Sequence, residues 1–348
     1  MRRFVLLARA TALALLVVFV TASAAGACGS LVAANGAVNL VRTSTLAAYH
    51  DGVEHYVTSF EFSGAPKTFG SIIPLPDKPS TVEKAGNWTL QRLEREVTPD
   101  ALESQAFAAT SALRADQVQV IQQVRIDSLD VTILRGGGRA VAKWANAQGF
   151  DLTRDAPAVL DFYSRRSPYF MAAKFDESAA VDAGFGGGDG IPVHLAIPTD
   201  NPWVPLRILG AAKVPQAPVN ADVFLLTDHK PSLLYGKGFS VVQSERASTT
   251  LLDDLRSDER SSWVPKDGWL TYGRVSGRAD EVLTDLAIDV HGNTPQLRDT
   301  GAVSRRGLVL NTVPLPTPGP SLAWTLGAVA AGIVVLAGVG VAVRRLDH

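Results

Sequence analysis

Cysteine is almost absent from this chain, since Cys28 is the only one among 348 residues. A single cysteine excludes an internal disulfide, so the fold must be held by its hydrophobic core alone. Local signatures of nucleophilic catalysis are missing too, because neither G-x-S-x-G nor S-x-x-K occurs. A serine triad needs no local signature, so these absences do not exclude an enzyme.

The chain has no excess of basic residues, with 33 lysines and arginines against 34 aspartates and glutamates. Residues 28–320 keep 28 basic and 33 acidic residues, because five arginines and one aspartate lie outside that range; their net charge is −5. A nucleic-acid-binding face needs clustered lysine and arginine. The charge balance therefore predicts no nucleic-acid partner.

One long apolar run, Ser321–Val343, contains neither a charge nor a proline. As a helix, these 23 residues would measure about 35 Å, which exceeds the hydrocarbon thickness of about 30 Å. Arg344 and Arg345 follow at once, and basic residues beside a span favour the cytoplasmic side. The sequence thus predicts a transmembrane helix over 321–343 and a cytoplasmic tail over 344–348.

The first 27 residues have the features of a secretory signal peptide. Arg2 and Arg3 precede an apolar run, and small residues up to Ala27 follow it. We expect cleavage after Ala24 or after Ala27. Ordinary export fits better than twin-arginine export, because Phe4 follows the second arginine directly.

Together, the two ends predict an exported domain that stays tethered to the cell membrane. Residues 28–311 are expected outside the cytoplasm as one α+β domain, the alternative being two lobes with a break near residue 240. Residues 312–320 carry four prolines and are expected to form an extended stalk. Lipidation of Cys28 stays open, although Ala25 stands where a lipidation site prefers leucine.

The apolar run also contains two pairs of small residues four positions apart, Ala328 with Gly332 and Gly338 with Ala342. Such pairs let helices approach closely, so one interpretation is a homodimer through the span. The other is that glycine and alanine merely reflect a GC-rich code. The expected partners are the membrane, an unidentified envelope protein or ligand, and a second copy of the chain.

The patterns between residues 44 and 290 predict an α+β fold, with mostly antiparallel strands and a few helices. Asp51-Gly52 is typical of the tight turn of a hairpin, which we expect over 44–62. Helices are expected at about 88–97, 139–148, 156–165 and 249–256. The other expected strands are 69–75, 118–126, 129–134, 169–175, 192–197, 204–209, 222–226, 268–275 and 283–290.

A series of segments between residues 27 and 230 forms a recognisable pattern. In order, they are ACG at 27–29, the hairpin around Asp51-Gly52, FGSIIPLP, SLDVTIL, AKWANAQGFDL, YFMAAKFD, PVHLAIPTDNPWVPLRI and ADVFLLT. This pattern resembles the bacterial domain-of-unknown-function family 2330, whose members are exported and often anchored in the membrane. The resemblance implies an exported α+β protein, and it implies no activity, ligand or site residue.

The predicted hairpin turn is a candidate metal site. His50 and His55 flank it, together with Asp51 and Glu54. Imidazole and carboxylate groups suit zinc, and two histidines across a hairpin can share a surface metal. Their spacing differs from the helical metalloprotease motifs, so ordinary exposed turn residues are the alternative. No other cofactor is predicted.

Several other features have a structural interpretation that we prefer. Gly136–Gly138 lies between a strand and a helix, as a phosphate loop would, but no Walker lysine follows. The glycine-rich loop Asp182–Gly190 could hold calcium, although it lacks the spacing of known calcium loops. His194 lies within a predicted strand and is expected as a satisfied residue of the core or of a sheet face, and His229 and His291 are other possible bases. The scattered tryptophans are also expected in the core: 88, 144, 203, 263 and 269.

Taken together, the sequence favours a non-enzymatic binding or interaction module at the bacterial cell envelope. The alternative is an envelope hydrolase, metal-assisted through histidines such as His50 and His55. Stoichiometric, tightly bound zinc would favour the enzyme, whereas a stable metal-free fold would favour the binding module.

Overall fold

The computed structural model describes residues 30–33, 39–63, 69–97, 118–150, 152–175, 191–211 and 213–312 of the chain. All of them belong to one unit, Met1–Val313. In this described part, no helix has both the length and the apolar character needed to cross a bilayer. The predicted signal peptide, Cys28, the loop 182–190 and the predicted span 321–343 lie outside the described residues.

The largest sheet has seven strands and carries the candidate site. All neighbouring strands are antiparallel except β11 and β2, which are parallel. In spatial order they are β13 (Phe239–Arg246), β14 (Trp269–Arg278), β11 (Pro218–Thr227), β2 (Asn39–His50), β3 (Val53–Ser63), β9 (Val193–Pro198) and β5 (Thr81–Lys84).

Two smaller antiparallel sheets hold the other strands of the described residues. The five-stranded sheet has the order β1 (Ser30–Ala33), β4 (Phe69–Pro74), β8 (Tyr169–Phe175), β7 (Leu129–Arg135) and β6 (Gln119–Ile126). The four-stranded sheet has the order β10 (Trp203–Val204), β15 (Leu286–Asp289), β12 (Ser232–Tyr235) and β16 (Val309–Asn311). The predicted α+β class with mostly antiparallel strands is therefore confirmed.

The alternation of side chains along the strands gives both large sheets two apolar faces. One face of the seven-stranded sheet packs on the five-stranded sheet, for example through Tyr56 and Leu195 against Ile133 and Met171. Residues of the four-stranded sheet join this central core. Burying a side chain of this size contributes about 1.5–3 kcal/mol. The two outer faces are left for helices to cover.

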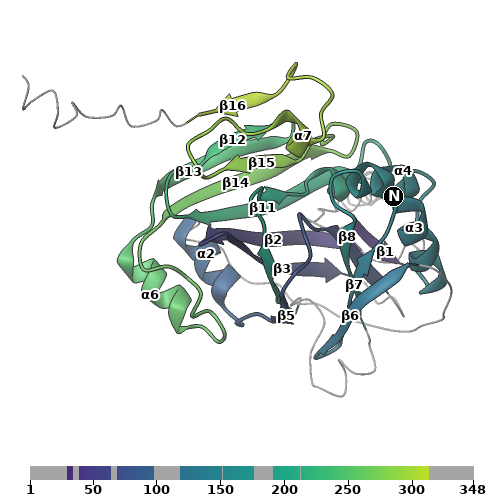
Figure 1. Cartoon of the computed structure of the whole chain (residues 1–348), viewed down its shortest axis with the longest axis horizontal. Coiled ribbons are helices and arrows are strands. Elements are labelled where there is room, and N and C mark those ends of the chain that lie inside the picture. The colour runs from purple at the N-terminus through teal and green to yellow at the C-terminus, as the bar shows by residue number, and fades with distance from the viewer. Residues whose placement is uncertain are drawn as a thin grey trace, which may run out of the picture. The chain divides into compact units, whose positions relative to one another are not determined.

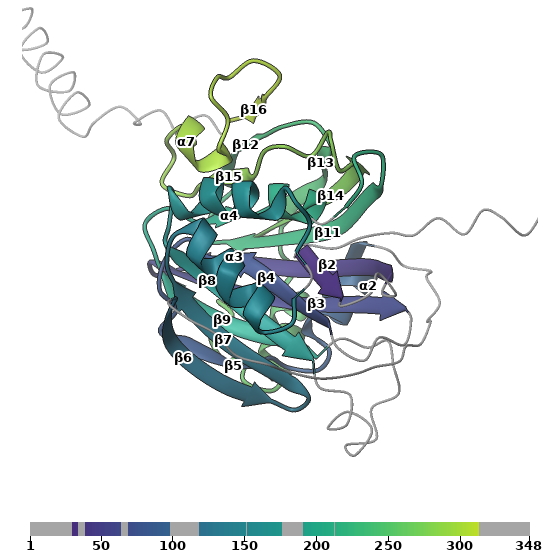
Figure 2. The ribbon, with the colours of Figure 1, turned by 90° about the vertical axis from the view of Figure 1, so that its right-hand side faces the viewer.

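Four helices cover these outer faces (Figures 1 and 2). The described unit is therefore layered as two helices, the seven-stranded sheet, the smaller sheets, and two more helices. The helices α2 (Thr89–Val97) and α6 (Thr249–Ser257) pack on the outer face of the seven-stranded sheet. The helices α3 (Gly138–Ala147) and α4 (Ala156–Ser164) pack on the five-stranded sheet. A short helix, α7 (Leu297–Thr300), precedes β16.

Two predicted local features are confirmed. Asp51 and Gly52 both have positive φ, 49° and 77°, as the tight turn of a right-twisted hairpin requires. Gly149, with φ of 87°, directly follows the C-cap residue of α3, as predicted. In the glycine-rich connection 136–138, a Cβ on Gly138 would lie 2.0 Å from a backbone nitrogen of α4. That glycine therefore permits the close contact between α3 and α4.

The predicted strand 204–209 is wrong for most of its length. It is replaced by the two-residue β10 and a 3-10 helix at Arg207–Gly210. The physical reason is that the backbone N–H groups of Leu206 and Arg207 donate to the carboxylate of Asp285 instead of to a neighbouring strand. The expected strand 283–290 is correspondingly shorter, because β15 begins only after this aspartate.

Candidate functional site

The candidate site lies on the helix-covered face of the seven-stranded sheet, near the edge formed by β3, β9 and β5. The pairing of β5 with β9 sets Glu83 directly opposite His194. The pairing of β9 with β3 sets His194 opposite Val57, which places His55 diagonally from it on the same face. Strand register thus gathers three polar residues that are far apart in sequence.

These three side chains form a hydrogen-bonded chain. Nδ1 of His194 lies 3.0 Å from Oε1 of Glu83, and Nε2 of His194 lies 3.0 Å from Nδ1 of His55. The two imidazole planes are within 13° of each other. The indole of Trp263 lies flat over both rings, at centroid distances of 4.4 Å from His55 and 5.1 Å from His194. Stacking of this kind restricts both rings to one orientation.

The hydrogen-bond order assigns the protons when Glu83 is ionised. His194 then donates through Nδ1 and accepts at Nε2, so His55 donates through Nδ1. This leaves Nε2 of His55 with a free lone pair, suited to accept a proton or bind a cation. Burial, helped by the neighbouring His194 and His50, lowers the pKa of His55 to about 4. Burial also lowers the pKa of His194, although Glu83 opposes this. Both rings are therefore neutral at pH 7.

His50, the other predicted metal ligand, makes different contacts. It shares the sheet face with His55 as a diagonal neighbour across the hairpin. Its Nδ1 lies 2.6 Å from Oδ1 of Asp228, and its Nε2 lies 3.3 Å from Oδ2 of Asp51. Among the described residues, no group of three or more His, Cys, Asp or Glu side chains is arranged to hold a metal ion. A metal shared by His50 and His55 stays a prediction.

The remaining histidines lie apart from this chain of hydrogen bonds. The ring of His291 meets Tyr49 edge-on at a centroid distance of 6.1 Å. The backbone carbonyl of His229 accepts a hydrogen bond of 2.7 Å from the hydroxyl of Thr227. Neither ring contacts the pair formed by His55 and His194 in the described part of the chain.

A buried carboxyl group occupies the opposite face of the same hairpin. Glu54 is completely buried, and burial raises its pKa to about 8, with the backbone N–H of Trp203 opposing the rise. No donor in the described residues meets full hydrogen-bond geometry with either oxygen. The group is therefore mostly neutral at pH 7. It faces the core, away from the histidines.

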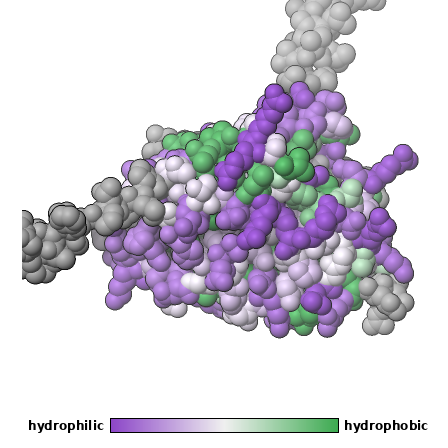
Figure 3. All heavy atoms as spheres, turned by 45° about the horizontal axis from the view of Figure 1, so that its top comes forward, coloured by the Kyte–Doolittle hydropathy of each residue, from purple (hydrophilic) through white to green (hydrophobic). Residues whose placement is uncertain are grey.

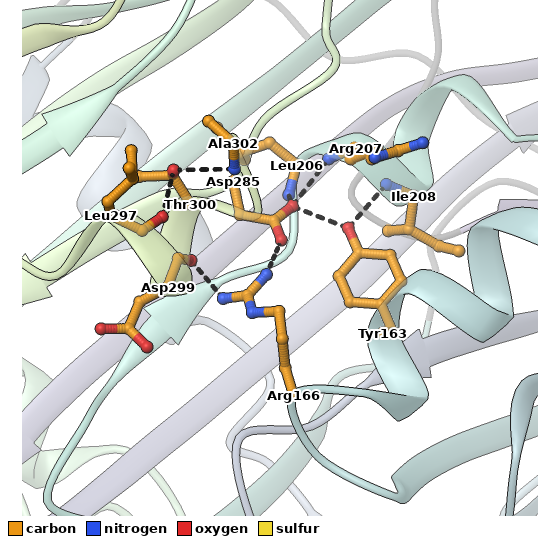
Figure 4. Close-up of polar contacts among 10 residues, drawn as sticks. All are labelled: Tyr163, Arg166, Leu206, Arg207, Ile208, Asp285, Leu297, Asp299, Thr300 and Ala302. Carbon is orange, nitrogen blue, oxygen red and sulfur yellow. Dashed lines mark hydrogen bonds and ion pairs between the residues drawn. The ribbon is translucent and has the colours of Figure 1, made fainter. Parts of the chain in front are cut away.

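A second polar cluster, centred on Asp285, joins α4, the 3-10 helix and the start of β15 (Figure 4). One carboxylate oxygen accepts from the hydroxyl of Tyr163 at 2.7 Å and from the backbone N–H groups of Leu206 and Arg207 at 2.8 and 2.9 Å. The other oxygen accepts from Arg166. Asp285 is completely buried, so each of these partners replaces a water.

Arg166 completes the cluster and shows that its role is structural. Its guanidinium also donates to the backbone carbonyl of Asp299, within α7. It stacks on the ring of Trp203 at 4.0 Å from the centroid. Burial raises the pKa of Tyr163 well above its ordinary value, and the nearby carboxylate of Asp285 raises it further, so the hydroxyl remains a donor. Figure 4 shows the carboxylate of Asp285, the guanidinium of Arg166 and the hydroxyl of Tyr163 all engaged within the fold.

Sequence reasoning missed most of the histidine site. It expected His194 as a satisfied residue of the core or of a sheet face, expected Trp263 in the core, and did not single out Glu83. The alternation in PVHLAI is one signal that could have helped, because it sets His194 on the face opposite to Val193 and Leu195. No local signal gives the register that joins β5, β9 and β3.

Comparison with known proteins places the chain in a family. Residues 22–232 match the family described as "Uncharacterized protein conserved in bacteria (DUF2330)". Because the match spans more than half of the chain, this protein belongs to that bacterial family, as its segments had suggested. No curated protein matches the chain. The crystal structure of baculovirus P35 is similar at 10% sequence identity, covering 79% of this chain and 97% of that one, with a TM-score of 0.33 that is too low to support a conclusion.

Proposed function

We propose that this protein is a single-pass membrane protein whose α+β domain acts as a binding or interaction module at the bacterial cell envelope. The observation that carries the proposal is the order of its segments. A secretory signal at 1–27 precedes the α+β residues, and the uncharged run 321–343 follows them, with two arginines directly after it. The proposed topology has the domain outside and the C-terminus in the cytoplasm.

The contacts of the described side chains support binding rather than catalysis. The hydrogen-bonded chain from Glu83 ends at His55, to which no hydroxyl or thiol is bonded in the described residues. A hydroxyl or thiol nucleophile would have to lie at hydrogen-bond distance from the histidine that activates it. The most deeply buried ion pair, between Asp285 and Arg166, is fully used within the fold. A tethered domain whose histidine chain is not bonded to a nucleophile among the described residues is best suited to bind a partner.

Site-specific photo-cross-linking of the full-length protein in cells tests this proposal. One photoreactive residue replaces exposed Ser262, beside the indole that covers the histidines, and a matched one replaces exposed Arg139 on α3, in the opposite helical layer. We expect one reproducible envelope partner to be captured from position 262 and not from position 139. Identical adducts from both positions, or none from either, would contradict a specific binding face.

The second candidate is an envelope hydrolase, and the chain Glu83–His194–His55 is the observation that favours it. A carboxylate that orients one imidazole, which in turn orients another, leaves Nε2 of His55 as a base that can activate water. Metal assistance would recruit His50, its diagonal neighbour. Zinc bound stoichiometrically to the full-length protein, lost in His55→Ala and kept in His291→Ala, would support this candidate. Equal zinc content in the two variants would rule out metal assistance.

A further inference from the structure

Exposed apolar side chains gather at one end of the described unit. Four of the seven large apolar residues that are exposed in the described part of the chain are Leu283, Val303, Val309 and Leu310. Three of them lie within the last ten described residues, in and before β16. Leu283 belongs to the same neighbourhood, because the adjacent Thr284 and Leu308 both approach Gly236. Figure 3 turns this end forward and shows apolar groups set among strongly hydrophilic ones.

The charges beside Val303, Val309 and Leu310 are positive. Val303 is followed by Ser304, Arg305 and Arg306, and all four are exposed. No acidic residue occurs between positions 302 and 312. Neither arginine forms an ion pair with another described residue; Arg305 makes only a long hydrogen bond of 3.4 Å to the carbonyl of Pro295. Apolar side chains flanked by unpaired arginines match the boundary between lipid headgroups and acyl chains.

The position of this end in the chain provides an independent argument. β16 ends at Asn311, and the predicted span begins at Ser321. The nine residues from 312 to 320 can reach at most about 30 Å even when fully extended. The headgroup layer on each side of a bilayer occupies about 5–7 Å of that distance. The C-terminal end of the described unit is therefore the end that a membrane anchor would hold nearest to the lipid.

We propose that this end rests on the outer surface of the cell membrane. We call it the membrane-proximal face and define it as Leu283, residues 303–306, Val309 and Leu310. The valines and leucines insert among the headgroups, and Arg305 and Arg306 contact the phosphates of anionic lipids. This inference rests on the proposed membrane anchoring, and it adds that the domain is oriented by the lipid as well as tethered to it.

Lipid quenching of single fluorescent probes tests the inference on the full-length protein in vesicles of phosphatidylglycerol and phosphatidylcholine. In a Cys28→Ser background, a probe is attached at Val303→Cys on the membrane-proximal face. The matched control is Val120→Cys, another exposed valine, on β6 at the far end of the unit (Figures 1 and 2). We expect headgroup-linked quenchers to quench the probe at 303 several-fold more than the probe at 120. The double substitution Arg305→Glu and Arg306→Glu should reduce quenching at 303 without releasing the protein from the vesicles.

The possible failures are distinguishable. If the protein does not float with the vesicles, the proposed anchoring itself fails. If it floats but the two probes are quenched equally, the domain is tethered without lipid contact and this inference alone is overturned. A third result is that, in detergent without lipid, the probe at 303 is shielded from solvent and the protein has the mass of a dimer. The face then pairs with a second copy through the edge strand β16, which also overturns the lipid assignment.

Discussion

Removal of one charge from the buried Asp285 cluster should destabilise the whole unit. The substitution Asp285→Asn keeps the shape of the side chain and the oxygen that accepts from Tyr163 and from two backbone N–H groups. It replaces the other oxygen, which accepts from Arg166, with an NH2 donor. Two donors then face each other, and a guanidinium that is only 11% exposed loses its counter-charge.

The expected loss of stability is large for the replacement of one oxygen by an NH2 group. Leaving one partner of a buried ion pair uncompensated costs about 3–5 kcal/mol. For a unit of this size, that loss lowers the Tm by roughly 10 °C. The matched control is Asp280→Asn, because Asp280 pairs with Arg278 at the surface, where the two side chains are 35% and 51% exposed. Exposed pairs are screened by water and salt, so the control should melt close to the wild type.

Thermal unfolding of the purified full-length protein, followed by tryptophan fluorescence, measures this difference. The double substitution Arg166→Met with Asp285→Asn adds a second check. It removes the unpaired charge, so it should be more stable than the sum of the two single losses predicts. Equal Tm values for Asp285→Asn and Asp280→Asn would refute the reasoning, and so would strict additivity in the double variant.

Three further predictions concern single side chains. In the folded state Glu54 has a pKa of about 8, against 4.5 ordinarily, so raising the pH through this window should destabilise the protein. The total loss of stability should be about 3–5 kcal/mol. Glu54→Gln should remove this pH dependence from the melting curves, and an unchanged pH dependence would contradict the buried carboxyl. Trp263→Ala uncovers the imidazole pair, so an NMR titration should show the pKa of His55 rising from about 4 toward 6.5; no rise would show that the indole does not bury it. Gly138→Ala forces a Cβ into the backbone of α4 and should lower the free energy of unfolding by denaturant by about 1–3 kcal/mol. Gly137→Ala, with open space around the new Cβ, should cost far less. Equal losses of stability in the two variants would argue against the close helix contact.

Local signals in the sequence predicted the elements whose causes are local. The hairpin turn follows from two residues that tolerate positive φ, and the end of α3 follows from Gly149. The predicted strand 204–209 failed because a distant aspartate, Asp285, captures the backbone donors of that segment. A window of neighbouring residues contains no information about such an acceptor. The same limit hid β12 and β16, which pair with each other across more than seventy residues.

The candidate site shows this limit most clearly. His50 and His55 were singled out because they are close in sequence, yet the structure bonds His55 to His194, on β9. The link depends on the register of β9 against both β3 and β5, and a shift of one residue would move His194 to the other face. Register is fixed by how the two apolar faces of the sheet pack, so it emerges only with the whole fold.

Topology is the measurement that tests the central claim most directly. A reporter enzyme that is active only outside the cytoplasm is fused after His348, at the end of the chain, and in a second strain after Thr312, before the predicted span. We predict activity for the fusion after Thr312 and none for the fusion after His348. Activity after His348, or inactivity of both fusions, would contradict an exported domain held by a C-terminal span.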